Sequence, residues 1–205
     1  GDGLPDLFCD DPSSTSVVRT ITNQGSARFI LGPTISNLAG GFSRVIAADL
    51  DGNQSPDLVA IDNLNEVSTV LNQFGFEGTI AAVTPPAPSA SRSVLGVSRS
   101  TNLSILTTAD VNSDGFDDLI SIASNAPQFQ VSLGNGNGTF GTPTTYSITS
   151  GPTSIKAADV NGDGKPDLLL TRSTGIGVLL NNGSGGFGAE TTITASTSGF
   201  KLVVG

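Results

Sequence analysis

The sequence predicts an all-β protein, and three observations lead to this prediction. Short runs of aliphatic and β-branched residues alternate with turns along the 205-residue chain, which contains 26 Gly and 11 Pro. No stretch keeps a 3.6-residue hydrophobic period over three turns, so no helix is expected. The runs and turns also recur at intervals of roughly 50 residues, which is typical of repeat architectures.

An acidic segment of nine residues marks each repeat. Three full copies are present, and the first residues of the chain match the second half of another copy. Because the closing aspartates are spaced similarly along the chain, the segments divide it into units of comparable length. The full copies lie at 49–57, 110–118 and 159–167, and the half copy lies at 1–6.

Each unit contains four short apolar runs, which is the pattern of a four-stranded β-propeller blade. One blade cannot bury both faces of its sheet, so neighbouring blades must stack. The predicted fold is a β-propeller of about four blades in a single repeat domain, 1–205, that is part of, or assembles into, a larger ring or polymer. The expected parts are blade 1 at 1–38 completed by a strand at 199–205, blade 2 at 42–83, a Pro-rich inter-blade loop at 84–92, blade 3 at 103–149 and blade 4 at 153–197.

The two ends of the chain complement each other. Residues 199–205 read like the strand that precedes an acidic segment, and residues 1–6 supply the second half of such a segment. We expect 201–204 to pair beside the run 4–9, either within one molecule as a four-bladed ring or between molecules as a dimer or head-to-tail polymer. The alternative is that both ends are a cut through a larger propeller.

The acidic segments carry oxygen-bearing side chains at positions 1, 3, 5 and 9. Alternate positions of a tight loop point inward, and position 7 is expected to supply its backbone carbonyl. Oxygen ligands without nitrogen or sulfur donors select a hard cation and favour Ca²⁺ over Mg²⁺. The expected metal ligands are Asp49, Asp51, Asn53, Ser55, Asp57, Asp110, Asn112, Asp114, Phe116, Asp118, Asp159, Asn161, Asp163, Lys165 and Asp167.

The distribution of charge supports this interpretation. Twelve of the 18 acidic residues lie in the four segments, and crowded carboxylates repel one another unless a cation neutralises them. By sequence, 159–167 fits the pattern best, whereas 49–57 has Gln54 where glycine is expected. The half-site at Asp2 and Asp6 is not expected to hold calcium alone.

Two other interpretations of the acidic segments were weighed. Asp, Asn and Gly are common in ordinary turns that bind no metal. An EF-hand begins with similar residues but requires a bidentate glutamate at position 12 and flanking helices. Position 12 is Ala60, Ser121 or Leu170 here, each inside an apolar run. The segments therefore predict strand–loop–strand calcium sites, about three in number.

Composition excludes several functions. The chain has no His, which removes Ser-His and Cys-His mechanisms and imidazole zinc sites, and its one cysteine, Cys9, cannot close an internal disulfide. The net charge of −9 disfavours nucleic acid as a partner, and no apolar run is long enough to span a membrane.

Residues outside the segments suggest no catalytic site. Asp62 and Glu66 could form a carboxylate pair, but the acids there are most simply solvated surface charges. A phenylalanine follows the Asn/Gly turn of each repeat and is expected in the core before it is a ligand platform. The acids are Asp10, Asp11, Asp62, Glu66, Glu77 and Glu190, and the phenylalanines are Phe29, Phe76, Phe140 and Phe187.

The strings at 157–170 and 179–188 resemble the FG-GAP/VCBS repeat, which builds calcium-bearing propellers in integrin α subunits and many bacterial extracellular proteins. The resemblance covers almost the whole chain. It implies calcium at the positions named above, an extracellular or cell-surface location, and a role in adhesion or recognition. Family propellers usually have about seven blades, which differs from the four expected here.

The expected function is therefore a non-catalytic calcium-binding module for adhesion, recognition or structural assembly. Its expected partners are a protein or glycan ligand, or further copies joined through the terminal strands. The alternative is a glycan-binding lectin, or a catalytic or non-catalytic part of a polysaccharide-active enzyme.

Overall fold

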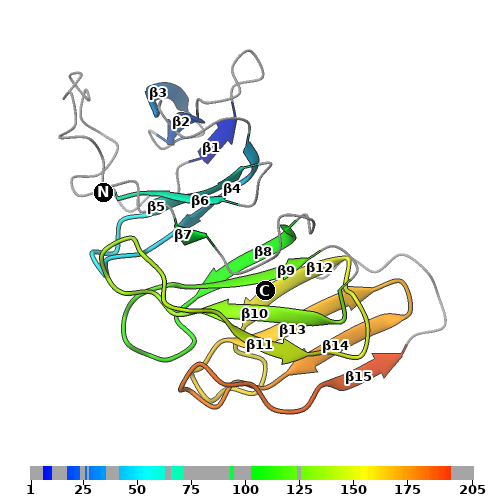
Figure 1. The fold of residues 1–205 in the computed structure, drawn as a ribbon. Coiled ribbons are helices and arrows are strands. Elements are labelled where there is room, and N and C mark those ends of the chain that lie inside the picture. The colour runs from blue at the N-terminus through cyan, green and yellow to red at the C-terminus, as the bar shows by residue number, and fades with distance from the viewer. Residues whose placement is uncertain are drawn as a thin grey trace. The chain divides into compact units, whose positions relative to one another are not determined.

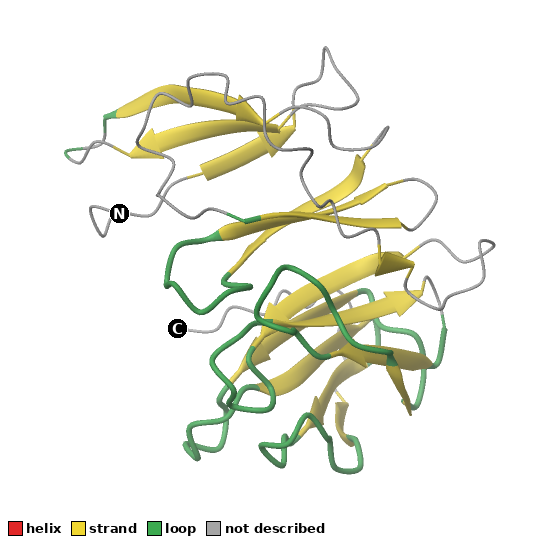
Figure 2. Cartoon of the chain, turned by 60° about the vertical axis from the view of Figure 1, so that its left-hand side comes forward, coloured by secondary structure: helices red, strands yellow, loops and turns green. Residues whose placement is uncertain are grey.

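The structure is a computed structural model of the 205-residue chain. It describes residues 7–10, 18–23, 26, 28–35, 42–62, 66–71, 93–94, 103–123 and 126–194. Every regular element within these ranges is a β-strand, so the all-β prediction is confirmed for the part of the chain that is described (Figure 2). The same residues contain no helix long and apolar enough to cross a membrane.

The strands form four antiparallel sheets, each made of strands consecutive in the chain (Figure 1). The first sheet has three strands and each of the others has four. Their bounds are β1 Leu7–Asp10, β2 Val18–Asn23, β3 Phe29–Ile35; β4 Phe42–Ala48, β5 Asp57–Asp62, β6 Glu66–Val70, β7 Ser93–Val94; β8 Leu103–Ala109, β9 Asp118–Ala123, β10 Gln128–Ser132, β11 Thr144–Ser147; β12 Ser154–Ala158, β13 Asp167–Arg172, β14 Gly175–Leu179 and β15 Thr191–Thr194.

The second sheet differs from the expected boundaries. Its fourth strand, β7, pairs with β6 and comes after the Pro-rich segment 84–92, which was expected to separate two blades. That segment therefore lies between two strands of one sheet. A two-residue strand carries no periodic pattern by which a sequence could reveal it. The strand expected at 199–205 lies outside the described residues.

The chain divides into two compact units. The first contains 1–95 with 136–139, and the second contains 96–135 with 140–205. In the first unit, Val18 of β2 packs with Leu58 and Ala60 of β5. Half-buried Cys9 lies in β1 of this unit.

The second unit has the larger core. Aliphatic side chains from β9, β10, β13 and β14 meet there, and the strands β9 and β13 are buried on both faces. Phe129 and Tyr146 stack at 4.9 Å between ring centroids, and Phe187 packs edge-on against both. The buried residues of this core are Val111, Ile120, Ile122, Phe129, Val131, Ile148, Ile155, Leu168, Leu170 and Leu179.

Candidate metal centre

The three acidic loops occupy equivalent places in three sheets. We define them as residues 49–57, 110–118 and 159–167, and each joins the first strand of a four-stranded sheet to the second. The residue before each loop pairs with the closing aspartate, as Ala48 does with Asp57. Ala109 with Asp118 and Ala158 with Asp167 repeat this register. The strand pairing therefore closes all three loops at the same point.

The closing aspartates, at position 9, are fully buried in all three loops. One oxygen of each accepts a hydrogen bond from the backbone N–H at position 2, at 2.8 Å for Asp57 and Asp118 and 3.2 Å for Asp167. The second oxygen of Asp118 accepts from Gly134 N at 2.8 Å, and that of Asp167 from Asn181 N at 2.8 Å. These two carboxylates thus tie the loop to the turn that follows the third strand.

The environment of Asp118 disfavours its charged form. Burial is the largest cause and raises its pKa to about 6, although the N–H groups of Gly134 and Val111 act in the opposite direction. The negative charges of Asp114 and Asp110 raise it further. A cation at this loop would relieve the repulsion between these carboxylates.

The aspartate at position 1 organises each loop through backbone N–H groups. Asp159 accepts hydrogen bonds from Gly162 and Gly164, each at 2.8 Å, and the bond from Gly164 is the largest cause that lowers its pKa. Asp49 accepts at 2.9 Å from both Gly52 and Gln54. In loop 110–118, Asp110 at position 1 accepts from the N–H groups of Asp114 and Gly115, at positions 5 and 6.

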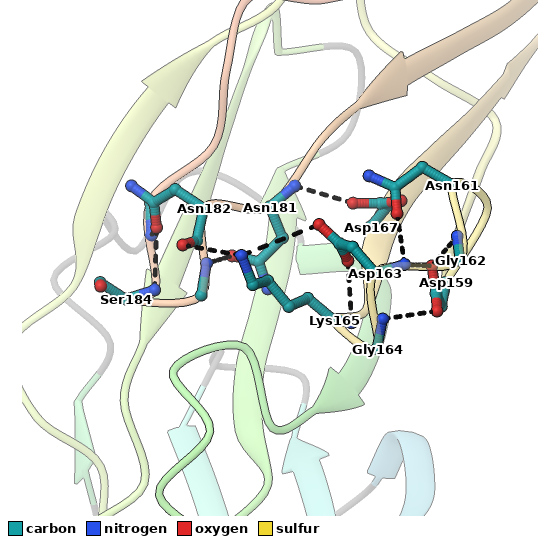
Figure 3. Close-up of polar contacts among 12 residues, drawn as sticks. Asp159, Asn161, Gly162, Asp163, Gly164, Lys165, Asp167, Asn181, Asn182 and Ser184 are labelled. Carbon is teal, nitrogen blue, oxygen red and sulfur yellow. Dashed lines mark hydrogen bonds and ion pairs between the residues drawn. The ribbon is translucent and has the colours of Figure 1, made fainter.

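Positions 3 and 5 hold their side chains by short local turns. In loop 159–167, Asn161 Oδ1 accepts from Asp163 N at 2.9 Å, and Asp163 Oδ1 accepts from Lys165 N at 3.0 Å (Figure 3). The other two loops repeat both bonds. The backbone of each loop therefore fixes the side chains at positions 3 and 5.

The backbone carbonyl of position 7 was expected to bind the metal. In each loop, the N–H of the same residue donates a hydrogen bond to the side-chain oxygen of position 5. Lys165 at this position places its Nζ 3.8 Å from Asp163 Oδ2 and donates to the carbonyl of Asn182 at 3.4 Å. The expected metal role of the Ser55, Phe116 and Lys165 carbonyls stays a prediction.

One loop brings three carboxylates together. Oxygens of Asp49, Asp51 and Asp57 lie within 4.8 Å of one another, so these residues could hold a metal ion. Loop 159–167, which fits best by sequence, has the same three carboxylates and one amide, but the amide is Asn161 at position 3, whereas in loop 49–57 it is Asn53 at position 5. Oxygen-only donors suit a hard cation such as Ca²⁺. The half-site at Asp2 and Asp6 lies outside the described residues.

Two buried polar residues of the second unit, one beside the loop at Asp167 and one at the far end of β13, were not recognised from the sequence. Asn181 is buried and donates from Nδ2 to Val111 O at 2.9 Å, while its N–H bonds to Asp167. Its only sequence signal is its place at the start of an Asn/Gly turn. Glu190, interpreted as a solvated charge, is instead buried and paired with Arg172. That interpretation was wrong because its partner lies 18 residues earlier in the chain, at the end of β13, and only the fold brings the two together.

The second half of the chain is similar to a known family of repeats. The FG-GAP-like repeat model matches residues 110–170 and 159–205. No curated protein matches the chain in sequence. A lectin from Agrocybe aegerita, characterised by specific recognition of non-reducing terminal N-acetylglucosamine, shares 19% identity at a TM-score of 0.59, covering 89% of this chain and 48% of the lectin. The chain thus spans about half the length of that lectin.

Two further solved structures show weaker similarity. The Tc holotoxin pore of Photorhabdus luminescens has a TM-score of 0.40 and 16% identity, with 98% of this chain and 12% of the toxin chain covered. A TcdB2-TccC3-Cdc42 structure has a TM-score of 0.40 and 14% identity, with 90% and 15% covered. The comparison with the lectin shows a shared fold, whereas the TM-scores of the other two structures, both 0.40, are too low to show one.

Proposed function

Residues 110–205 belong to the FG-GAP-like repeat family, as the sequence predicted, and from this premise we propose that the protein is a calcium-stabilised, non-catalytic recognition module. The observation that carries the proposal is the repetition of one donor set in three equivalent loops. Position 1 is a carboxylate in all three, positions 3 and 5 are carboxylates or amides, and position 9 is a buried carboxylate.

The residues present fit Ca²⁺. Asp49, Asp51, Asn53 and Asp57 would hold it in the first full loop, and the matching residues would do so in the other two. All side-chain donors are oxygens, and Ca²⁺ accepts a flexible number of them, whereas Mg²⁺ requires near-octahedral geometry. Bound calcium would supply positive charge among carboxylates that otherwise repel one another. The function of the ion is therefore structural.

The sheets support a propeller arrangement for this module. Each is an antiparallel meander whose strands are consecutive in the chain, which is how propeller blades are built. We propose four such blades, and an extracellular location, where millimolar calcium fills sites of modest affinity. Recognition of a protein or glycan would then use the surface of a rigid scaffold.

Glycan binding is the second candidate, and the likeness to the Agrocybe aegerita lectin favours it. Because 19% identity shows the fold alone, N-acetylglucosamine is only the first probe to use. Titration calorimetry with this sugar, in calcium and in chelator, tests it. Heat of binding that requires calcium supports a lectin, and no heat leaves protein recognition or assembly as the proposed role.

Thermal unfolding in calcium and in chelator tests the metal proposal. At a calcium concentration ten times Kd, each site adds about 1.4 kcal/mol, so three sites raise Tm by roughly 8–16 °C. Magnesium at the same concentration should give a much smaller rise. Identical melting in calcium and chelator would contradict the proposal.

A matched pair of variants localises the effect. Asp114→Ala removes an exposed ligand at position 5, whereas Asp117→Ala removes the same charge three residues further in the same loop, at a position outside the donor set. We expect calorimetry to show one fewer calcium site for Asp114→Ala and an unchanged number for Asp117→Ala. Equal losses would mean that net charge, and not coordination, determines the response.

A further inference from the structure

A chain of hydrogen bonds connects two of the acidic loops in the second unit. Asp167, which closes loop 159–167, accepts from Asn181 N at 2.8 Å, and Asn181 Nδ2 donates to Val111 O at 2.9 Å. Val111 N in turn donates at 2.8 Å to Asp118, which closes loop 110–118. We call these bonds the relay. All its residues are buried, and hydrogen bonds in such an interior are stronger than those in water.

The side chain of Asn181 is held in the orientation that the relay requires. Its Oδ1 accepts from Gly183 N at 2.9 Å, which leaves Nδ2 as the group that donates to Val111 O. Gly185 N, from the same turn, donates to the same carbonyl at 3.0 Å. Figure 3 shows the bond from Asn181 to Asp167 at the start of this turn. The turn therefore contacts both acidic loops of the second unit.

Aromatic packing fixes this turn, although the turn phenylalanine is not buried in every sheet. The ring centroid of Phe187, at the end of the turn, lies 5.6 Å from that of Phe129, and Tyr146 Oη donates to Gly185 O at 3.0 Å. Phe29, in the equivalent turn of the first sheet, was predicted to lie in the core but is 48% exposed. That prediction was wrong because burial at this position depends on the sheet that the turn meets, which the repeat alone does not specify.

The equivalent turn of the third sheet contains only the first bond of the relay. Gly134 pairs with Phe140 there as Asn181 pairs with Phe187 in the last sheet. Both Gly134 and Asn181 donate their N–H to the closing aspartate of the preceding loop. Glycine has no side chain, so no second bond can leave position 134. The repeat therefore forms this turn without an asparagine, and the side chain of Asn181 serves a purpose other than building the turn.

We propose that Asn181 couples calcium binding at loop 110–118 to calcium binding at loop 159–167. The inference rests on the proposed metal sites. The closing aspartate of a filled loop is held in one position, and the relay extends this restraint to the closing aspartate of the other loop. The second loop is then partly ordered before it is filled, so it loses less conformational entropy on binding and binds more tightly. Asn181 is thus a positioning residue for both loops, and the coupling acts equally in both directions.

A calcium titration of the isotope-labelled chain, followed by NMR, measures the filling of each loop separately. Gly115 and Gly164 donate their N–H to the position-1 aspartates of the two loops, so their amide signals report calcium there. Asn161→Ala removes an uncharged ligand from loop 159–167 and should raise the calcium midpoint of Gly115. Asn112→Ala in loop 110–118 should likewise raise that of Gly164. Because the two loops carry the same donors, a coupling of about tenfold raises each midpoint about threefold.

Asn181→Ala tests whether the relay carries the coupling. In this background, Asn161→Ala should no longer raise the midpoint of Gly115, whereas a merely structural role would shift the midpoints and keep their dependence on the other loop. Asn182→Ala is the matched control, because its Oδ1 accepts two N–H bonds within the same turn but is not part of the relay. It should preserve the rise. Asn181→Gly, which reproduces the third-sheet turn, replaces the alanine variant if that variant does not fold.

The possible results separate the coupling from the metal sites. If Gly115 and Gly164 respond to calcium but neither midpoint depends on the other loop, the coupling is overturned and the metal sites stand. A rise that persists when Asn181→Ala and Asn161→Ala are combined would also overturn the coupling, since the link would then bypass Asn181. No calcium response at either glycine would overturn the proposed metal sites and the coupling with them.

Discussion

Replacing Glu190 with alanine should destabilise the second unit, because Glu190 neutralises a buried guanidinium. Arg172 Nη1 lies 2.6 Å from Glu190 Oε1, and the two side chains are only 6% and 5% exposed. Arg172 Nε also donates to Ser150 O at 3.0 Å, and Glu190 Oε2 accepts from Thr149 N and Oγ1 at 2.7 and 2.8 Å. The pair therefore connects β13, the link before β12 and the residues before β15.

Alanine at 190 would leave the Arg172 charge buried without its partner. Loss of one member of a buried ion pair costs about 3–5 kcal/mol. For a chain of this length, such a loss corresponds to a fall in Tm of roughly 6–20 °C. Thermal and urea unfolding at pH 7, followed by circular dichroism, measure both quantities.

A double variant provides the control. Arg172→Leu combined with Glu190→Leu removes both charges, and buried pairs replaced in this way are often close to neutral in stability. The remaining loss should be about 1–3 kcal/mol, because the N–H of Thr149 loses its acceptor. If Glu190→Ala alone changes the free energy of unfolding by less than about 1 kcal/mol, Arg172 is solvated and the reasoning is refuted.

Two further predictions follow from single residues. Burial alone would raise the pKa of Glu190, but hydrogen bonds from Thr149 and the charge of Arg172 outweigh it and hold the pKa below 4.5. The ion pair therefore stabilises the folded protein fully above pH 4.5, and this stabilisation is lost as the pH falls through the lower pKa that Glu190 has in the folded protein. In urea unfolding, the free energies of wild type and Glu190→Gln should differ at neutral pH and converge at acid pH. Gln54 has a φ of 62°, where the equivalent Gly164 has 81°. Gln54→Gly should thus raise the free energy of unfolding by up to about 1 kcal/mol in urea titration, and a fall would show that the side chain holds the loop.

The sequence predicted the strands and loops well because their signals are local. Aliphatic runs flank each acidic segment, so the register that pairs Ala158 with Asp167 follows from where the polar residues begin and end. Non-local features carried no such signal. The partner of Glu190 and the exposed state of Phe29 depend on which strands meet in space, which a single sequence does not specify.

Backbone conformation in the loops was predicted only in part. Glycine at position 6 indicated a left-handed residue, and Gly115 and Gly164 adopt it. Position 4 is left-handed as well, in Gly52, Ser113 and Gly162. Serine at this position in one loop hid the pattern, because serine does not signal a positive φ.

The closing aspartate has a structural role that needs no metal. In each loop it is buried and accepts the position-2 N–H, so an aspartate is required there even without calcium. Its recurrence in the repeats is therefore weak support for a metal site. The residues at positions 1, 3 and 5 are different, because they are half-buried or exposed, and the loop N–H bonds that their side chains accept are ones that water could replace. Asp118→Ala should destabilise the protein in both calcium and chelator, whereas Asp114→Ala should do so mainly in calcium, and this difference separates the structural role from the metal-binding role.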